Sequence, residues 1–338
     1  MKFRSIIDPA GTGLKRSTLA LTAAVTAAVT ALCSEAGANT ITWNLPGDGD
    51  WDTTSPNWSG DAAVFVADGM VDVNFNTAAN TTITVDPNMV PKSTTLNPGA
   101  GNLTLTGGPI AGAGTLVKNG NGTATFGIAP TGPNIQNSYG GGTEINAGTL
   151  RVNYPSTSPF GTGPVTLNDG TLFLWRITAD NELVVNGGLL VSSNGFGNNW
   201  NGPMTLNSDL AVRCDFRLNA NGVISGNGGV IKTGNNTLNL NGTNDYTGDT
   251  TVSAGTLGTD GDSIDDGGKL VIDGGLVMPT GTETVDTLYF GTAQQVAGSW
   301  GASGSGATNI DDVRFTGTAG VVNVLNGIPP VSYTHLRA

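Results

Sequence analysis

Three tryptophans and four aspartates lie close together near the start of the chain, and their chemistry would suit a sugar. They are Trp43, Trp51, Trp58, Asp48, Asp50, Asp52 and Asp61. Indole rings present flat apolar faces to sugar rings, and carboxylates accept hydrogen bonds from hydroxyls. The pattern therefore suggests Trp43, Trp51 and Trp58 as ligand-binding residues. The favoured alternative is that the rings cover the open end of a stack of strands.

The alternating carboxylates from Asp48 to Asp52 do not form an EF-hand calcium loop. Such a loop needs Gly at its sixth position and Glu at its twelfth, where this chain has Thr53 and Ser59. A second acidic loop, residues 260–266, matches no better. We therefore predict no metal site and no cofactor, and we expect both acidic segments to be solvated turns.

Nucleophilic catalysis by a Ser-His-Asp or Cys-His arrangement lacks a usable histidine. The single histidine, His335, lies in residues 331–338, whose composition changes abruptly and resembles a translated sequencing adaptor. We expect that tail to be an artefact. Gly clusters such as Gly140 to Gly142 are not followed by a helix, as a phosphate-binding loop would be. No catalytic residue is assigned.

A repeated unit dominates the middle of the chain. Residues 226–257 contain three short runs of alternating side chains separated by Gly and Asn clusters, which predicts strands joined by turns. The same unit recurs in residues 112–152, where Lys118 corresponds to Lys232. Two copies of one unit indicate a fold that is built by stacking.

These residues resemble the autotransporter-associated β-strand repeat of secreted and surface-exposed proteins of diderm bacteria. Its pattern, G-x-L-x-K-x-G-x-G-T-L-x-L-x-G-x-N-x-Y-x-G-x-T-x-V-x-x-G-T-L, places Lys at Lys118 and Lys232 and Tyr at Tyr139 and Tyr246. The resemblance implies an all-β fold, a right-handed parallel β-helix (β-solenoid) with an N-terminal Trp-rich cap and a C-terminal β cap. It implies a structural or passenger role and no catalytic site.

The expected organisation has five parts. Basic residues, an apolar run and the small residues Ala36 to Ala38 indicate an export signal that is cleaved before Asn39. The apolar run is too short to span a bilayer. The parts are a signal peptide in 1–38, the Trp-containing cap in 39–80, the solenoid in 81–268, the C-terminal capping segment in 269–330 and the artefactual tail in 331–338.

Stacked turns would place short parallel strands about 4.8 Å apart. We expect one side of each strand to fill the interior and Thr and Lys side chains to face outward. The expected interior residues include Ile231, Leu238, Leu240 and Val252. We also expect Asn side chains at equivalent corners, for example Asn119 to Asn121 and Asn235 to Asn236, to form hydrogen-bonded ladders between turns.

Composition limits the partners. The chain has 52 Gly, 12% charged residues and a net charge of −12. Nucleic acid is excluded as a partner because phosphate binding needs a basic face, and the acidity suits solubility outside the cell. Cys33 lies in the expected signal and leaves Cys214 alone in the mature chain, so no intrachain disulfide is expected.

The sequence favours a non-enzymatic secreted or cell-surface protein that forms a rigid β-helical rod and is not integral to the membrane after signal cleavage. One alternative is an adhesin or glycan-binding module that uses exposed Trp, with cell-surface components or extracellular glycans as partners. A third is a β-helix polysaccharide lyase or hydrolase, whose nearest candidates, Asp311, Asp312 and Arg314, fall in the expected C-terminal cap.

Overall fold

The computed structural model describes residues 39–127, 136–156, 159–193 and 197–329. The expected signal and the tail lie outside these residues. The chain divides into two compact units, Met1–Asn39 and Thr40–Ala338, and every described residue except Asn39 belongs to the second. The described residues contain strands and turns and no helix.

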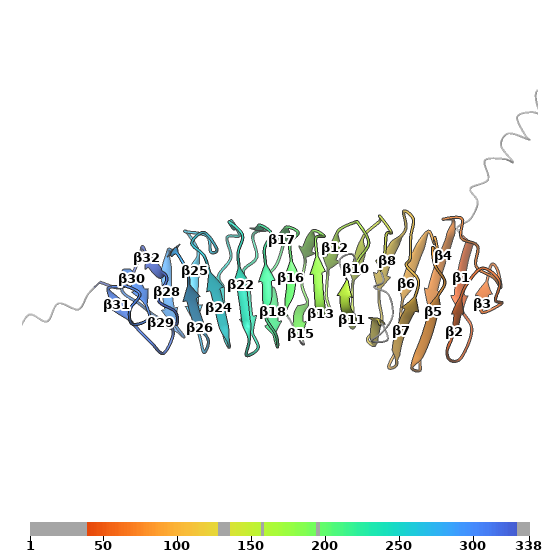
Figure 1. The fold of residues 1–338 in the computed structure, drawn as a ribbon, viewed down its shortest axis with the longest axis horizontal. Helices are drawn as coiled ribbons and strands as arrows, with labels where there is room; N and C mark the ends of the chain where they lie inside the picture. The colour runs from red at the N-terminus through yellow and green to blue at the C-terminus, as the bar shows by residue number, and fades with distance from the viewer. Residues whose placement is uncertain (1–38, 128–135, 157–158, 194–196, 330–338) are drawn as a thin grey trace, which may run out of the picture. The chain divides into compact units, whose positions relative to one another are not determined.

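The fold is a parallel β-solenoid of about ten turns, which confirms the predicted all-β stacked architecture. Figure 1 shows successive strands lying side by side in chain order along the solenoid. Most neighbours in the stack are parallel, for example β11 with β13 and β13 with β15. The predicted right-handed winding remains a prediction.

The strands form three faces and a terminal sheet. The first face contains β3 (Trp58–Gly60), β1 (Asn39–Trp43), β4 (Val71–Phe75), β6 (Ser93–Leu96), β8 (Thr115–Lys118), β10 (Thr143–Ile145), β12 (Val165–Leu167), β14 (Leu183–Val185), β17 (Met204–Leu206) and β20 (Ile224–Gly226). The second face contains β2 (Gly49–Trp51), β5 (Thr81–Val85), β7 (Asn102–Gly107), β9 (Thr123–Phe126), β11 (Thr149–Ser156), β13 (Thr171–Ala179), β15 (Leu189–Ser193), β18 (Leu210–Cys214), β21 (Val230–Thr233), β23 (Thr250–Val252), β25 (Lys269–Ile272), β28 (Thr287–Phe290) and β29 (Ala293–Gln294).

The third face begins at the end of β13 and continues through β16 (Asn198–Trp200), β19 (Leu218–Ala220), β22 (Thr237–Leu240), β24 (Thr256–Thr259) and β26 (Leu276–Pro279). The terminal sheet has the order β27 (Thr282–Val285), β32 (Val321–Val324), β30 (Gly298–Gly301) and β31 (Asn309–Ile310). Antiparallel pairing occurs near both ends of the described chain, between β1 and β3 and between β30 and β32.

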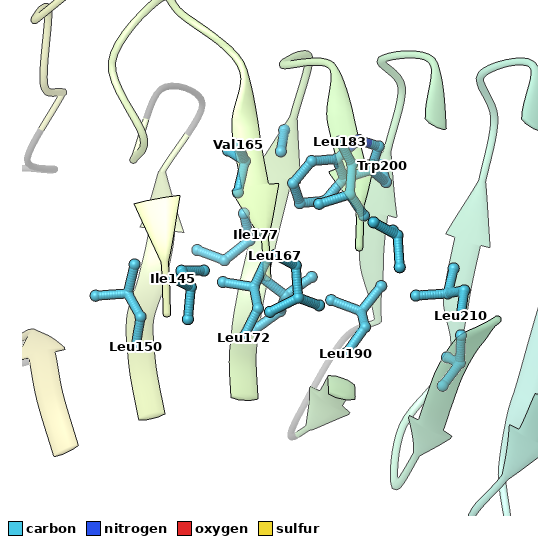
Figure 2. Close-up of a cluster of buried hydrophobic side chains, with 14 of the residues drawn as sticks. Ile145, Leu150, Val165, Leu167, Leu172, Ile177, Leu183, Leu190, Trp200 and Leu210 are labelled. Atoms are coloured by element: carbon cyan, nitrogen blue, oxygen red, sulfur yellow. The ribbon is translucent and has the colours of Figure 1, made fainter. Parts of the chain in front are cut away.

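Alternating side chains build the interior. In β5 the sequence Thr-Thr-Ile-Thr-Val alternates buried and exposed positions over its whole length, as expected for a strand with one wet face. Equivalent positions stack from turn to turn, so that Leu150, Leu172 and Leu190 form one inward column. Figure 2 shows these leucines pointing into the same apolar cluster. The predicted interior positions Leu238, Leu240 and Val252 are confirmed, each at most 1% exposed.

The prediction is wrong for one expected interior residue, Ile231, and for two lysines that were expected to face outward, Lys118 and Lys232. In β21 the buried positions are Val230 and Lys232, and Ile231 is partly exposed. Because side chains alternate along a strand, turning Val230 inward places Lys232 inward and Ile231 outward. Lys118 is likewise fully buried, and so is Thr250, although threonines were also expected outside.

Asn ladders join the turns at the predicted kind of corner. Asn146 donates to Asn119 at 3.0 Å, and the chain of amide bonds continues through Asn168, Asn186 and Asn207 at 2.7 Å each. The prediction is therefore confirmed for Asn119. It is wrong for Asn235 and Asn236, whose side chains make no ladder bond within the described residues: the Asn236 side chain accepts a hydrogen bond from its own neighbour, Thr237 N, at 3.0 Å.

Candidate functional site

The three tryptophans near the start of the chain point inward. Trp43, Trp51 and Trp58 are 5%, 0% and 3% exposed. The ring centroids of Trp43 and Trp58 are 5.1 Å apart at an angle of 85°, and Trp51 packs against Phe75 at 5.3 Å and against Phe65 at 5.4 Å. These edge-to-face contacts are typical of aromatic packing. In this arrangement the rings fill the interior beside β1 and β3 and offer no exposed face to a sugar.

Two of the aspartates beside these rings accept hydrogen bonds from backbone N–H groups. Asp48 accepts a hydrogen bond from Thr82 N at 2.6 Å. Asp52 accepts from Thr54 N at 2.7 Å and from Ser55 N at 2.6 Å, which is a common use of Asp at a turn. In the part of the chain that the structure describes, no three His, Cys, Asp or Glu side chains are grouped closely enough to hold a metal ion.

The candidate catalytic residues near the C-terminus make local hydrogen bonds. Arg314 donates to Asp311 at 2.8 Å and lies 4.3 Å from the ring centroid of Phe290. Asp312 instead accepts two hydrogen bonds from Ser303. The two carboxylates thus have separate local partners.

Two buried lysines link successive turns of the solenoid. Lys118 Nζ donates to Asn119 O at 2.7 Å, Gly120 O at 2.8 Å and Ala147 O at 2.9 Å. Three carbonyl acceptors satisfy the three donors of an ammonium group, so the charge is tolerated inside. Burial lowers the pKa of Lys118 to about 8, which still leaves it protonated at neutral pH.

The second lysine repeats this geometry. Lys232 Nζ donates to Thr233 O, Gly234 O and Ala254 O at 2.8 Å each. In both copies a glycine follows the Ala acceptor with a positive φ, 63° at Gly148 and 66° at Gly255. A Cβ at Gly255 would lie 2.8 Å from Lys232 Nζ and would clash with Gly234 O. The corner therefore needs Gly for both conformation and space.

Buried polar side chains have hydrogen-bond partners inside the solenoid. The hydroxyls of Tyr139 and Thr143 lie 2.6 Å apart, and those of Tyr246 and Thr250 are also 2.6 Å apart. Glu283 is fully buried and accepts hydrogen bonds from the N–H groups of Ser263 and Ile264. Burial raises the pKa of Glu283 to about 7.

A polar groove lies on the outer side of the second face. It has a volume of about 500 Å³. Its lining residues come from β7, β9 and β11 and from the residue after β9, and they are Asn102, Thr104, Thr106, Thr123, Thr125, Gly127, Arg151 and Asn153. This groove was not predicted from the sequence. The sequence feature that could have indicated the groove is a set of polar residues at equivalent outward positions of consecutive strands. These positions can be recognised as equivalent only when the strand register is known.

The two repeat copies match the model of a known family. The model of the passenger-associated-transport-repeat family matches residues 116–152 and 230–258. The chain carries two copies of this repeat. Each matched segment of this repeat protein spans two stacked turns: β8 and β9 lie beside β10 and β11, and β21 and β22 lie beside β23 and β24. The resemblance seen in the sequence is thus confirmed.

The repeat protein is also similar to a named adhesin. It is 29% identical over 229 residues to the Adhesin BmaC autotransporter of Brucella suis biovar 1 (strain 1330). The match covers 63% of this chain and 6% of that protein. No solved structure matches the chain. Within the described residues, no helix is long and apolar enough to cross a membrane.

Proposed function

We propose that the chain is a passenger segment, secreted by a diderm cell or exposed on its surface, with an adhesin-like role. The observation that carries this proposal is that both repeat copies are built into one continuous parallel solenoid. The similarity to a named autotransporter adhesin supports it. The chain spans only 6% of that adhesin, so the adhesive role of this segment is a proposal of its own.

The solenoid would act as a rigid support. About ten turns are joined by backbone ladders, by the Asn ladder from Asn119 to Asn207 and by the ammonium groups of Lys118 and Lys232. Each link crosses from one turn to the next, so bending the stack would break hydrogen bonds. Small-angle X-ray scattering of the purified protein should give a rod-like profile, and an isotropic particle would contradict the rigid rod.

We propose that the segment has no enzymatic activity. Support comes from the local hydrogen bonds that occupy Asp311 and Asp312 separately. Incubation with pectin, alginate and β-glucan, with and without Ca²⁺, should release no reducing ends and no unsaturated products. Appearance of either product would overturn this part of the proposal.

Export and exposure are tested in cells. The full chain with a C-terminal epitope tag is expressed in a diderm bacterium, and the N-terminus of the recovered protein is sequenced after cell fractionation. We expect an N-terminus at Asn39 and recovery of the protein outside the cytoplasm. We expect its partners to be cell-surface components or extracellular glycans, with no nucleic acid bound. A full-length product that stays in the cytoplasm would contradict the proposal.

A further inference from the structure

The polar groove on the second face is formed by a step between short and long side chains. On β7 and β9 the outward positions are occupied by Thr104, Thr106 and Thr125. The strand register places Thr104 beside Thr125, and Thr125 beside Arg151. The threonines therefore form a low floor, and Arg151 of β11 rises beside them as a wall.

Two aromatic rings hold Arg151 in place. Its Cζ lies 4.6 Å from the ring centroid of Phe173 and 5.0 Å from that of Trp175, both on β13 in the next turn. Arg151 Nε donates to Asn153 Oδ1 at 2.7 Å. Stacking and this hydrogen bond fix the guanidinium, which would otherwise be a flexible surface group. A preorganised guanidinium loses less entropy when it binds a ligand.

Among the described residues, the terminal nitrogens of Arg151 donate no hydrogen bond, which leaves them for a ligand. Several other surface cations already have a carboxylate partner, including Arg213 with Asp215 at 3.1 Å and Lys92 with Asp72 at 3.0 Å. Arg151 forms no ion pair within the described residues. A fixed guanidinium in a groove that has no carboxylate partner among the described residues selects for an anionic group, above all a carboxylate that accepts two parallel hydrogen bonds.

The rest of the groove suits a polyhydroxylated chain. Its floor supplies hydroxyls from consecutive turns, which repeat about every 4.8 Å along the solenoid. Each hydroxyl can donate and accept a hydrogen bond. A volume of about 500 Å³ falls in the usual range for small-ligand sites, but the lining is polar where most such sites are apolar. A linear ligand that lies across β7, β9 and β11 would meet Thr104, Thr125 and Arg151 in turn.

We propose that this groove binds a linear acidic glycan, with a uronate carboxylate on Arg151 and sugar hydroxyls on Thr104, Thr125 and Asn153. The inference deepens the proposed adhesin-like role and rests on it for its biological setting. Binding itself is measured with purified protein in solution. The two tests are therefore independent: absence of glycan binding would contradict the groove proposal alone, and absence of export would contradict the proposed function alone.

The test uses three acidic oligosaccharides, namely oligogalacturonate, oligoalginate and oligohyaluronate, in isothermal titration calorimetry at low salt. At least one should bind. If that ligand is oligogalacturonate or oligoalginate, its methyl ester should bind at least tenfold more weakly. If the ligand is oligohyaluronate, its carboxyl-amidated derivative should bind at least tenfold more weakly. Absence of binding by all three would overturn the proposal, and so would equal affinity for the acid and its uncharged derivative.

Variants of the same face complete the test. Arg151→Gln should weaken binding at least tenfold, and Arg151→Lys should retain part of the affinity because it keeps the charge but not the planar fork. Arg213→Gln is the matched control, since Arg213 lies on the same face and is already paired. Circular dichroism should show all three variants folded. Wild-type affinity in Arg151→Gln, or equal losses in Arg151→Gln and Arg213→Gln, would contradict the assignment.

Discussion

Lys118 and Lys232 donate equivalent sets of three hydrogen bonds although they lie on different faces of the solenoid. Lys118 ends β8 on the first face, and Lys232 lies in β21 on the second. Each ammonium binds two carbonyls at the end of its own strand and one carbonyl in the next turn. The repeat is therefore a local unit that joins two turns, and its structure does not depend on which face carries it.

Glycine at the corner beside the ammonium should be irreplaceable. Gly255→Ala places a Cβ against Gly234 O and Lys232 Nζ and forces a non-glycine residue to a φ of 66°. We expect a loss of about 2–3 kcal/mol of unfolding free energy, measured by urea denaturation. Gly47→Ala is the control, because nothing lies within 4 Å of its added Cβ. Equal stability of the two variants would argue against the steric account.

The Asn ladder should contribute measurably to stability. Asn168 donates to Asn146 and accepts from Asn186, both at 2.7 Å. Asn168→Ala removes both bonds and should cost about 1–2 kcal/mol, since each net hydrogen bond contributes about 1 kcal/mol. Asn235→Ala provides the control, because Asn235 is exposed and has no side-chain hydrogen bond in the described part of the chain. A loss as large in Asn235→Ala would mean that the ladder is not the cause.

Glu283 should make stability depend on pH. Its folded-state pKa is about 7, raised by burial from 4.5. Between these values the unfolded carboxyl ionises and the folded one stays protonated, so the folded state binds more protons and stability falls as pH rises from about 4.5 to about 7. The decrease should approach about 3 kcal/mol, at about 1.4 kcal/mol per pKa unit.

Glu283→Gln should remove that part of the pH dependence, because Gln does not titrate. The comparison is made by urea unfolding of both proteins across pH 4 to 8. The wild-type curve should descend relative to the variant curve over this interval. Parallel curves would show that Glu283 titrates with the same pKa in the folded and unfolded states.

Much of the fold follows from local pattern. The strand segments, the parallel stacking and the inward positions of Leu238, Leu240 and Val252 could be predicted because Gly and Asn mark the corners and apolar residues alternate between them. The inward lysines could not be predicted in the same way. A charged side chain is ordinarily placed outside, and only the positions of the carbonyls show that three acceptors surround each ammonium.

The candidate site was less accessible to sequence reasoning. The tryptophans were predicted to bind a ligand because indole rings can stack on sugars. Alternation of side chains in short strands instead turns Trp43 and Trp51 inward. The groove residues Thr125 and Arg151 belong to no recognisable motif in the sequence. They become neighbours only through the register between β9 and β11. Registers of parallel strands joined by loops of unequal length do not follow from composition.

The stabilising role of the inward lysine is tested most directly by Lys232→Met in urea unfolding at pH 7. The substitution keeps an unbranched side chain, one atom shorter and uncharged, but leaves Thr233 O, Gly234 O and Ala254 O without their shared donor. We predict a loss of about 3 kcal/mol, with less than about 1 kcal/mol in Lys269→Met, whose ammonium forms a surface ion pair with Asp249. Equal unfolding midpoints for these two variants would contradict the account.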